Sequence, residues 1–140
     1  SGNQMYDLKT MVDSSVRRSY NDVGGLAAKD KNSAAVMVWN HHDDDVIKPA
    51  LPVEIIIDGV PTKSAIVTQY IIDDKHSNSY EVWKKMGSPQ SPTKEQISTL
   101  EKAGQLEKVS VMKNQLVKQG KLIITTPLAQ QAVVLLKVDW

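Results

Sequence analysis

The sequence contains no cysteine, and this absence removes several kinds of chemistry at once. Thiol nucleophiles, disulfides and cysteine-ligated zinc sites are all excluded. A single domain of 140 residues nevertheless buries roughly 68–70% of the surface that its unfolded chain exposes. We therefore expect one hydrophobic core that forms without disulfides or metal.

Neither sign of charge dominates the chain. Seventeen Lys and Arg stand against sixteen Asp and Glu, which gives a net charge of +1, and the two signs are interspersed. Nucleic-acid-binding proteins usually carry a clustered basic patch, so we expect no nucleic-acid partner. No apolar run approaches the roughly 18 residues of a membrane span, and the first residues lack the apolar stretch of a secretory signal. We also expect no membrane partner.

Short apolar runs separated by turn residues predict a mostly β protein. Residues 29–32 are typical of a hairpin connection, and Asp58-Gly59 is a strong turn signal. The run 132–138 is continuously apolar, as in strands buried on both faces. About seven strands of this kind favour an antiparallel β-sandwich; they are expected at 23–28, 34–40, 53–57, 64–72, 109–112, 122–125 and 132–138.

An insertion at residues 73–106 interrupts the predicted strands with two short helices. Ser77 or Asn78 is suited to cap the first helix, and Gly87 ends it. The second helix begins at Thr93, where Thr93 and the following Gln96 predict a capping box. Two capped helices between sandwich strands indicate that another surface packs against them.

The chain divides into two predicted segments. Residues 1–22 form a linker in which 6–17 has the apolar spacing of a short helix, and residues 23–140 form the sandwich with its helical insertion. The predicted fold is therefore mostly β with two or three short helices. We found no internal repeat and no low-complexity stretch.

Imidazole and carboxylate groups are concentrated at residues 41–45, directly after a predicted strand. Such groups can bind a divalent metal. However, adjacent side chains on an extended chain point in opposite directions, and the calcium-loop pattern is absent. We expect a strand-end turn of unknown role formed by His42, Asp43, Asp44 and Asp45, and neither a metal site nor another cofactor.

No spacing in the sequence indicates a catalytic centre. Glycoside hydrolysis needs two carboxyl groups at a set separation, but Glu95 and Glu101 of the second predicted helix do not share a face. His76-Ser77 lacks the surrounding motif of a nucleophile elbow, and no glycine-rich phosphate loop is present. We expect no catalytic residue in this chain.

The aromatic residues occupy two kinds of position. Trp39 and Trp140 close apolar strands, which favours a place in the core or between domains. Tyr80 and Trp83 lie three residues apart on a predicted helix, so their rings share one face. Three partners for that face stay open at this point: the chain's own sandwich, a neighbouring domain or a ligand.

Several motifs together resemble β-xylosidases of glycoside hydrolase family 39. The first is VMVWNHHDDD at residues 36–45, and the second and more specific is YIIDDKHSNSY at 70–80 with VWKKMGSPQ at 82–90. Parts of 92–106 and of 127–136 continue the similarity. It covers most of the chain from about Val23 onward and is weaker before that residue.

The resemblance implies a protein of two parts. Members of this family and the related α-L-iduronidases carry a (β/α)8 barrel with an acid/base and a nucleophile glutamate, followed by a β-sandwich that packs on the barrel. Such a barrel needs about 250 residues, and no motif of this chain matches either glutamate. The resemblance therefore implies that this chain is the non-catalytic C-terminal sandwich of a retaining β-xylosidase, and not an enzyme by itself.

The resemblance also implies a role and partners for the insertion. We expect it to contact the catalytic barrel of the whole enzyme, within one protomer or across a homo-oligomer. There it would form part of the wall of a pocket for xylo-oligosaccharides. The residues expected at this rim or barrel contact are His76, Asn78, Tyr80 and Trp83. The alternative is a stand-alone carbohydrate-binding module, which requires coplanar aromatic residues exposed on a sandwich face.

Overall fold

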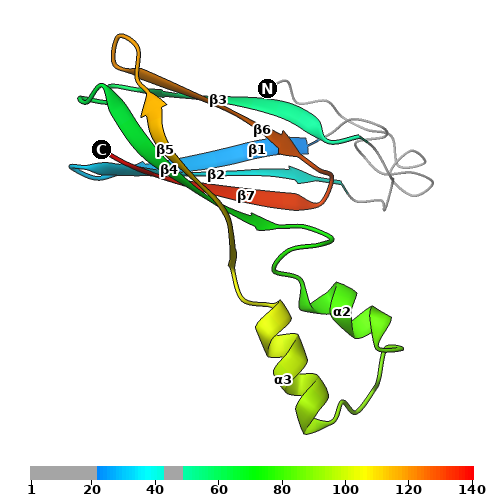
Figure 1. Cartoon of the computed structure of the whole chain (residues 1–140). Helices are drawn as coiled ribbons and strands as arrows, with labels where there is room; N and C mark the ends of the chain where they lie inside the picture. The colour runs from blue at the N-terminus through cyan, green and yellow to red at the C-terminus, as the bar shows by residue number, and fades with distance from the viewer. Residues whose placement is uncertain (1–21, 43–48) are drawn as a thin grey trace, which may run out of the picture.

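The computed structural model describes residues 22–42 and 49–140, which form seven strands and two helices (Figure 1). This mostly β architecture confirms the predicted antiparallel sandwich with two helices in an insertion. The elements in chain order are β1 (Asp22–Lys29), β2 (Ser33–His41), β3 (Leu51–Asp58), β4 (Ser64–Ile72), α2 (Ser79–Lys85), α3 (Lys94–Ala103), β5 (Glu107–Leu116), β6 (Lys121–Leu128) and β7 (Ala132–Asp139).

The strands form two antiparallel sheets whose order departs from the order of the chain. The larger sheet has the order β1-β2-β7-β4-β5, and the smaller one pairs β3 with β6. The β1–β2 connection is the predicted hairpin. Gly59 follows β3 with φ +76°, the left-handed region that glycine adopts without strain, and the chain then crosses to the other sheet. The last strand, β7, therefore lies in the middle of the larger sheet.

The hydrophobic core lies between the two sheets. Alternate residues of each strand point inward, so Val67 and Leu136, both 0% exposed, meet Leu122 and Ile124 of the smaller sheet. A polar bridge also crosses the core, because the Gln69 side-chain amide donates to Thr126 Oγ1 at 2.9 Å and its carbonyl accepts from Ser110 at 3.2 Å. Apolar packing and this bridge together hold the sheets face to face.

The two sheets present different surfaces to solvent. On the larger sheet, directly paired residues project to the same side and form three rows, here called the outer face: Leu26–Met37–Leu135–Tyr70, Gly24–Trp39–Val133–Ile72 and Ala28–Ala35–Lys137–Thr68. Lys137 is the one charged member of these rows over β1, β2, β7 and β4, and on the edge strand β5 the first row continues from Tyr70 to Lys108. The outward residues of the smaller sheet are Pro52, Glu54, Ile56, Asp58, Lys121, Ile123, Thr125 and Pro127, of which three are charged.

The prediction that β7 is buried on both sides is correct for one side. Leu136 and its inward neighbours are buried, whereas Val133 and Leu135 on the outer face are half-buried and Lys137 is exposed. The reason is that, among the described residues, no second layer covers the outer face. The apolar run reflects both sides of this strand, but only one of them has a partner.

Trp39 and Trp140 occupy different sides of the larger sheet. Trp39 lies on the outer face directly over Gly24, where an added Cβ would approach the indole to 2.7 Å. Trp140 is half-buried and packs against the core cluster, with Lys29 Nζ 5.8 Å from its ring centroid. A core role therefore holds for Trp140, while Trp39 belongs to the surface layer.

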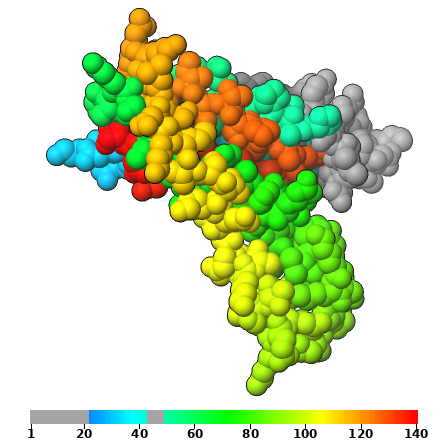
Figure 2. Space-filling view, viewed as in Figure 1, coloured from blue at the N-terminus to red at the C-terminus, as the bar shows by residue number. Residues whose placement is uncertain are grey.

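The helical pair α2–α3 extends away from the sandwich. It connects the end of β4 to the start of β5, and in Figure 1 the larger sheet lies between it and the smaller sheet. Figure 2 shows the pair as an arm that projects from the body of strands. The two helices pack mainly on each other. The insertion is therefore a separate small unit joined to the sandwich at one end.

Two of the predicted features lie outside the described residues: the helix at 6–17 and Asp43, Asp44 and Asp45 of the strand-end turn. The division into 1–22 and 23–140 stays a prediction. Neither α2 nor α3, the two helices of the described ranges, has the length and hydropathy needed to cross a membrane.

Candidate functional site: the helical insertion

The first helix of the insertion begins at an asparagine cap. Asn78 has extended backbone angles, and its side-chain oxygen accepts the Glu81 N–H at 3.1 Å, so that Asn78 rather than Ser77 is the N-cap. Glu81 in the first turn and Lys84 and Lys85 in the last turn suit the helix dipole. The Asn78 amide also donates to the Asp73 carbonyl at 2.8 Å, which joins the helix to the turn before it.

Ser77 joins the two ends of the insertion. Its hydroxyl donates to the Ile71 carbonyl of β4 at 2.7 Å and accepts the Glu107 N–H of β5 at 2.8 Å. Ser77 holds φ at +54°, a conformation that is uncommon for a side chain of this type. One side chain therefore bridges the last residues of one strand and the first residue of the next, and sets where the arm leaves the sheet.

Asp73 and His76 close the turn that leads into the insertion. One Asp73 carboxylate oxygen accepts from the backbone N–H groups of Lys75 and His76 at 2.8 and 2.7 Å, and lies 2.9 Å from His76 Nδ1. Burial acts to raise the pKa of Asp73, but these hydrogen bonds and the adjacent imidazole outweigh it, so the pKa lies below its ordinary value of 3.8. His76 is thus engaged in the turn.

The second helix begins with the predicted capping box. Thr93 Oγ1 accepts the Gln96 N–H at 3.3 Å, and the Gln96 side chain accepts the Thr93 N–H at 2.9 Å. At the other end, Ser79 Oγ donates to the Leu100 carbonyl at 2.7 Å and so ties α2 to α3. The helices approach closely there, because a Cβ added to Gly104 would lie 2.5 Å from Ser79 Oγ.

Tyr80 and Trp83 form a stacked pair on α2, as their spacing predicts. Their ring centroids are 5.7 Å apart with 24° between the planes, and Lys84 Nζ lies 4.8 Å from the Tyr80 centroid. Trp83 also donates from Nε1 to the Pro89 carbonyl at 3.0 Å. Trp83 therefore fastens the loop after α2, whereas Tyr80, which is 61% exposed, is the outermost ring of the pair.

The insertion has no side chain that is fully buried. No residue of α2 or α3, both of which lie in the described part of the chain, is fully buried. Ile97 of α3 is 45% exposed. Of the three partners left open by the sequence, the chain's own sandwich does not cover the helical face. Caps and hydrogen bonds hold this unit in shape, and its apolar groups are available to another surface.

The end of β2 is held by a glutamine far away in the sequence. The Gln131 side-chain oxygen lies 3.1 Å from His41 Nδ1 and accepts the His42 N–H at 3.4 Å, and its amide donates to the His42 carbonyl. His42 is 0% exposed, which favours a structural role for this end of the predicted turn. Among residues 22–42 and 49–140, no group of three metal-ligating side chains converges.

The sequence missed two of these contacts for different reasons. Gln131 adopts φ +58° after β6 and reaches β2 across the sheet order, and no local pattern indicates such a partner. The Ser77 bridge had a weak signal. If Asn78 caps the helix, the Ser77 hydroxyl is left to bind another group. The four residues expected at a pocket rim all lie in the insertion. His76, Asn78 and Trp83 already make hydrogen bonds within it.

Comparison with known proteins gives concordant results. The family model described as "Glycosyl hydrolases family 39" matches residues 3–117. The structure is similar to the family 39 enzyme from Xanthomonas axonopodis pv. citri, with a TM-score of 0.70 and 18% identity over 82% of this chain and 25% of that one. It is also similar to a family 39 β-xylosidase from Caulobacter crescentus, with a TM-score of 0.59 and 15% identity over 83% and 22% of the two chains.

A third similar structure is a bacterial orthologue of human α-L-iduronidase, with a TM-score of 0.60 and 16% identity over 85% of this chain and 22% of that one. At these identities the structures establish a shared fold. This chain spans about a quarter of the length of each of the three. The family model, in contrast, covers well over half of the chain. The chain therefore belongs to glycosyl hydrolase family 39.

Proposed function

We propose that this chain is the non-catalytic sandwich of a family 39 glycosidase, and that its α2–α3 pair leans on the catalytic barrel and walls the active-site rim. The observation that carries the proposal is the exposure of the pair. Two capped helices that bury none of their own side chains stand away from the sheets. Short helices of this kind are stabilised when a partner covers their apolar face.

Tyr80 is the residue best placed to reach that partner. His76 and Asn78 hold the turn and the cap, and Trp83 holds the following loop, so these three position the insertion. Tyr80 is anchored by stacking on Trp83 and is mostly exposed to solvent. Aromatic rings with a polar tip are common at interfaces because they combine apolar area with hydrogen bonding.

The chemistry belongs to the part of the enzyme that this chain does not match. The family relatives include a β-xylosidase and an iduronidase orthologue, and the matched region covers 22% of the length of each. A β-xyloside is therefore the substrate class we propose for the whole enzyme. Retaining hydrolysis needs two carboxyl groups about 5–5.5 Å apart. In this proposal no glutamate of this chain belongs to that pair.

The experiment compares hydrolysis of 4-nitrophenyl β-D-xyloside by the 140-residue chain and by the full-length gene product. We expect activity in the full-length protein alone. In that protein Tyr80→Ala should raise KM by about 2- to 10-fold, the equivalent of one aromatic contact of about 0.5–1.5 kcal/mol. Thr125→Ala, on the outward side of β6, is the matched control and should leave KM unchanged. Activity of the 140-residue chain, or an unchanged KM in Tyr80→Ala, contradicts the proposal.

A carbohydrate-binding module is the second candidate, and one observation favours it. Trp39 and Tyr70 both lie on the outer face, so this sheet carries two aromatic rings on one side. Affinity electrophoresis of the 140-residue chain in gels containing soluble xylan tests this function. Retardation that is lost in Trp39→Ala would favour it, whereas unretarded migration would exclude it for xylan.

A further inference from the structure

The outer face is apolar where a solvated sheet face is usually polar. Antiparallel sheets with one face in water alternate apolar and polar residues, yet β7 carries Val133 and Leu135 on this side. Leu26 and Ile72, at opposite edges of the face, are 54% and 41% exposed. Contiguous exposed apolar patches often mark interaction sites.

The charges of the outer face are arranged at its margin. Over β1, β2, β7 and β4, Lys137 is the single charged residue in the three rows, and it pairs with Asp139 at 3.1 Å beyond the last row. On the edge strand β5, Lys108 lies opposite Tyr70. The outward side of the smaller sheet carries a larger share of charge, since Glu54 and the paired Asp58 and Lys121 are three of its eight residues. Interface cores are depleted of charge and their rims are polar. The larger sheet is therefore closer in composition to an interface core than the smaller one, on which Ile56 and Ile123 are also exposed.

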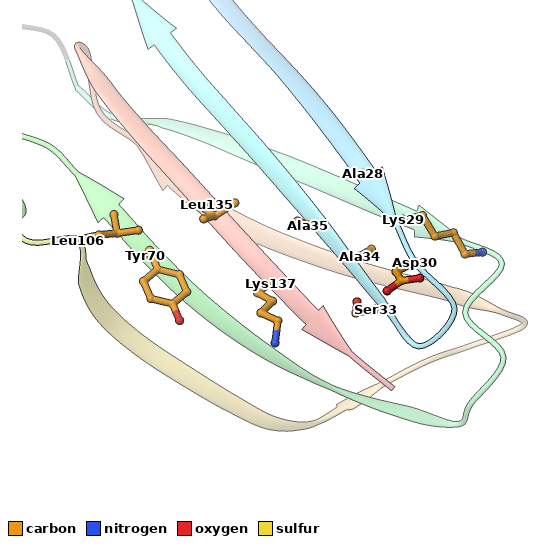
Figure 3. A pocket seen from close by; sticks show the side chains of 10 residues that line it. All are labelled: Ala28, Lys29, Asp30, Ser33, Ala34, Ala35, Tyr70, Leu106, Leu135 and Lys137. Carbon is orange, nitrogen blue, oxygen red and sulfur yellow. The ribbon is translucent and has the colours of Figure 1, made fainter.

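A groove joins this face to the helical pair. It has a volume of about 470 Å³ and runs along the sheet from the β1–β2 turn at Asp30 to Tyr70, Leu135 and Leu106 (Figure 3). Leu106 lies between the end of α3 at Ala103 and the start of β5 at Glu107, and is 50% exposed. The apolar surface of the sheet therefore continues without a break onto the base of the insertion.

We propose that the outer face, continued through Leu106 onto the α2–α3 pair, is the surface that docks the (β/α)8 barrel of the same polypeptide. This inference rests on the proposed function and specifies which of the two sheets meets the barrel. Three quarters of each similar family 39 structure lies outside the matched region, so a large partner is connected to a chain of this kind. The outer shell of such a barrel is a ring of helices, and helices packed on one face of a sheet are a standard layer arrangement.

The absence of cysteine makes single reporter thiols a direct test. Leu26→Cys and Ile72→Cys place thiols on the outer face, and Thr125→Cys places the control on the outward side of β6. Each variant is made in the 140-residue chain and in the full-length gene product, and maleimide labelling is followed by peptide mass spectrometry. Circular dichroism of the 140-residue variants checks that the fold is kept.

We expect all three thiols to react readily in the 140-residue chain. In the full-length protein the two outer-face thiols should react at least about tenfold more slowly, because labelling then requires the domains to separate. Thr125→Cys should keep its rate. Equal rates for the outer-face thiols in both proteins would overturn the docking surface while leaving the Tyr80 kinetics of the proposed function untouched.

Other outcomes also decide the proposal. A full-length gene product without a barrel overturns both this inference and the proposed function. Outer-face protection in the 140-residue chain that grows with protein concentration identifies a second copy as the occupant, and protection that is independent of concentration identifies the chain's own remaining residues. Either result overturns docking of the barrel at this face.

Discussion

The sandwich and the α2–α3 pair keep their shapes by different means. In the sandwich, side chains such as Val67 and Leu136 are removed completely from water, and burial of this kind is the dominant favourable term in folding. In the helical pair, order comes from the Asn78 cap, the Thr93 capping box and the Ser79 contact, while no side chain of either helix is fully buried. Short helices held by polar contacts alone are marginal in water. The comparison teaches that one unit is self-sufficient and the other is made to be covered.

The largest expected effect is the loss of a core side chain. Leu136→Ala should destabilise the chain by about 2–5 kcal/mol, because it removes a fully buried side chain from the central strand and leaves a cavity. Urea unfolding followed by circular dichroism measures the change. Leu106→Ala is the control: at 50% exposure it should shift stability by less than about 0.5 kcal/mol. Equal losses in the two variants would mean that the core is not where the sandwich places it.

The second prediction concerns the joint between the two units. Ser77→Ala removes the hydroxyl that bridges Ile71 and Glu107, leaving both backbone groups without this partner. We expect a cost of about 1–3 kcal/mol, expressed as faster hydrogen exchange of the Glu107 amide. Ser88→Ala is a matched control, because Ser88 also has a positive φ but its side chain makes no such bridge in the described hydrogen bonds. An unchanged Glu107 exchange rate would show that the bridge does not hold the arm.

A smaller effect is expected from the cap of the second helix. Thr93→Ala removes the acceptor of the Gln96 N–H, which should cost about 1 kcal/mol of helix stability. Because the helices pack mainly on each other, amide exchange in α3 should rise while the urea midpoint of the sandwich stays the same. A matching drop of that midpoint would mean that the two units unfold together.

The smallest effect is a pH dependence of the turn that leads into the insertion. The folded pKa of Asp73 lies below 3.8, so between the two values the unfolded chain binds more protons than the folded one. The stabilisation is complete above the ordinary pKa and is lost as the pH falls through the folded value. The amide resonances of Lys75 and His76 should therefore titrate with a midpoint below 3.8, and this step should disappear in Asp73→Asn. A midpoint at or above 3.8 would contradict the hydrogen-bonded turn.

The sequence predicted the local elements well because their causes are local. The strands at 64–72 and 132–138 follow from short apolar runs and turn residues, and the capping box follows from Thr93 and Gln96 three residues apart. Each of these signals lies within about ten residues of the element that it specifies. Such patterns need no knowledge of which strands become neighbours.

In the insertion the sequence predicted the spacing of the side chains, whereas their role as a functional site stays a prediction. The spacing of Tyr80 and Trp83 predicted a shared face, and the rings stack. Asn78 was one of two candidates for the helix cap, but nothing in the sequence indicated that His76 closes the turn with Asp73. The clamp by Gln131 had no signal at all, because it depends on β7 returning beside β2.

By itself, the sequence determined that the chain is mostly β with a two-helix insertion and that it contains no cysteine thiol. Only the tertiary structure decided that β7 lies between β2 and β4. That placement divides the apolar run 132–138 into a covered side and an uncovered one. The physical reason is that alternation assigns side chains to two faces of a strand, whereas long-range strand pairing decides which face receives a partner.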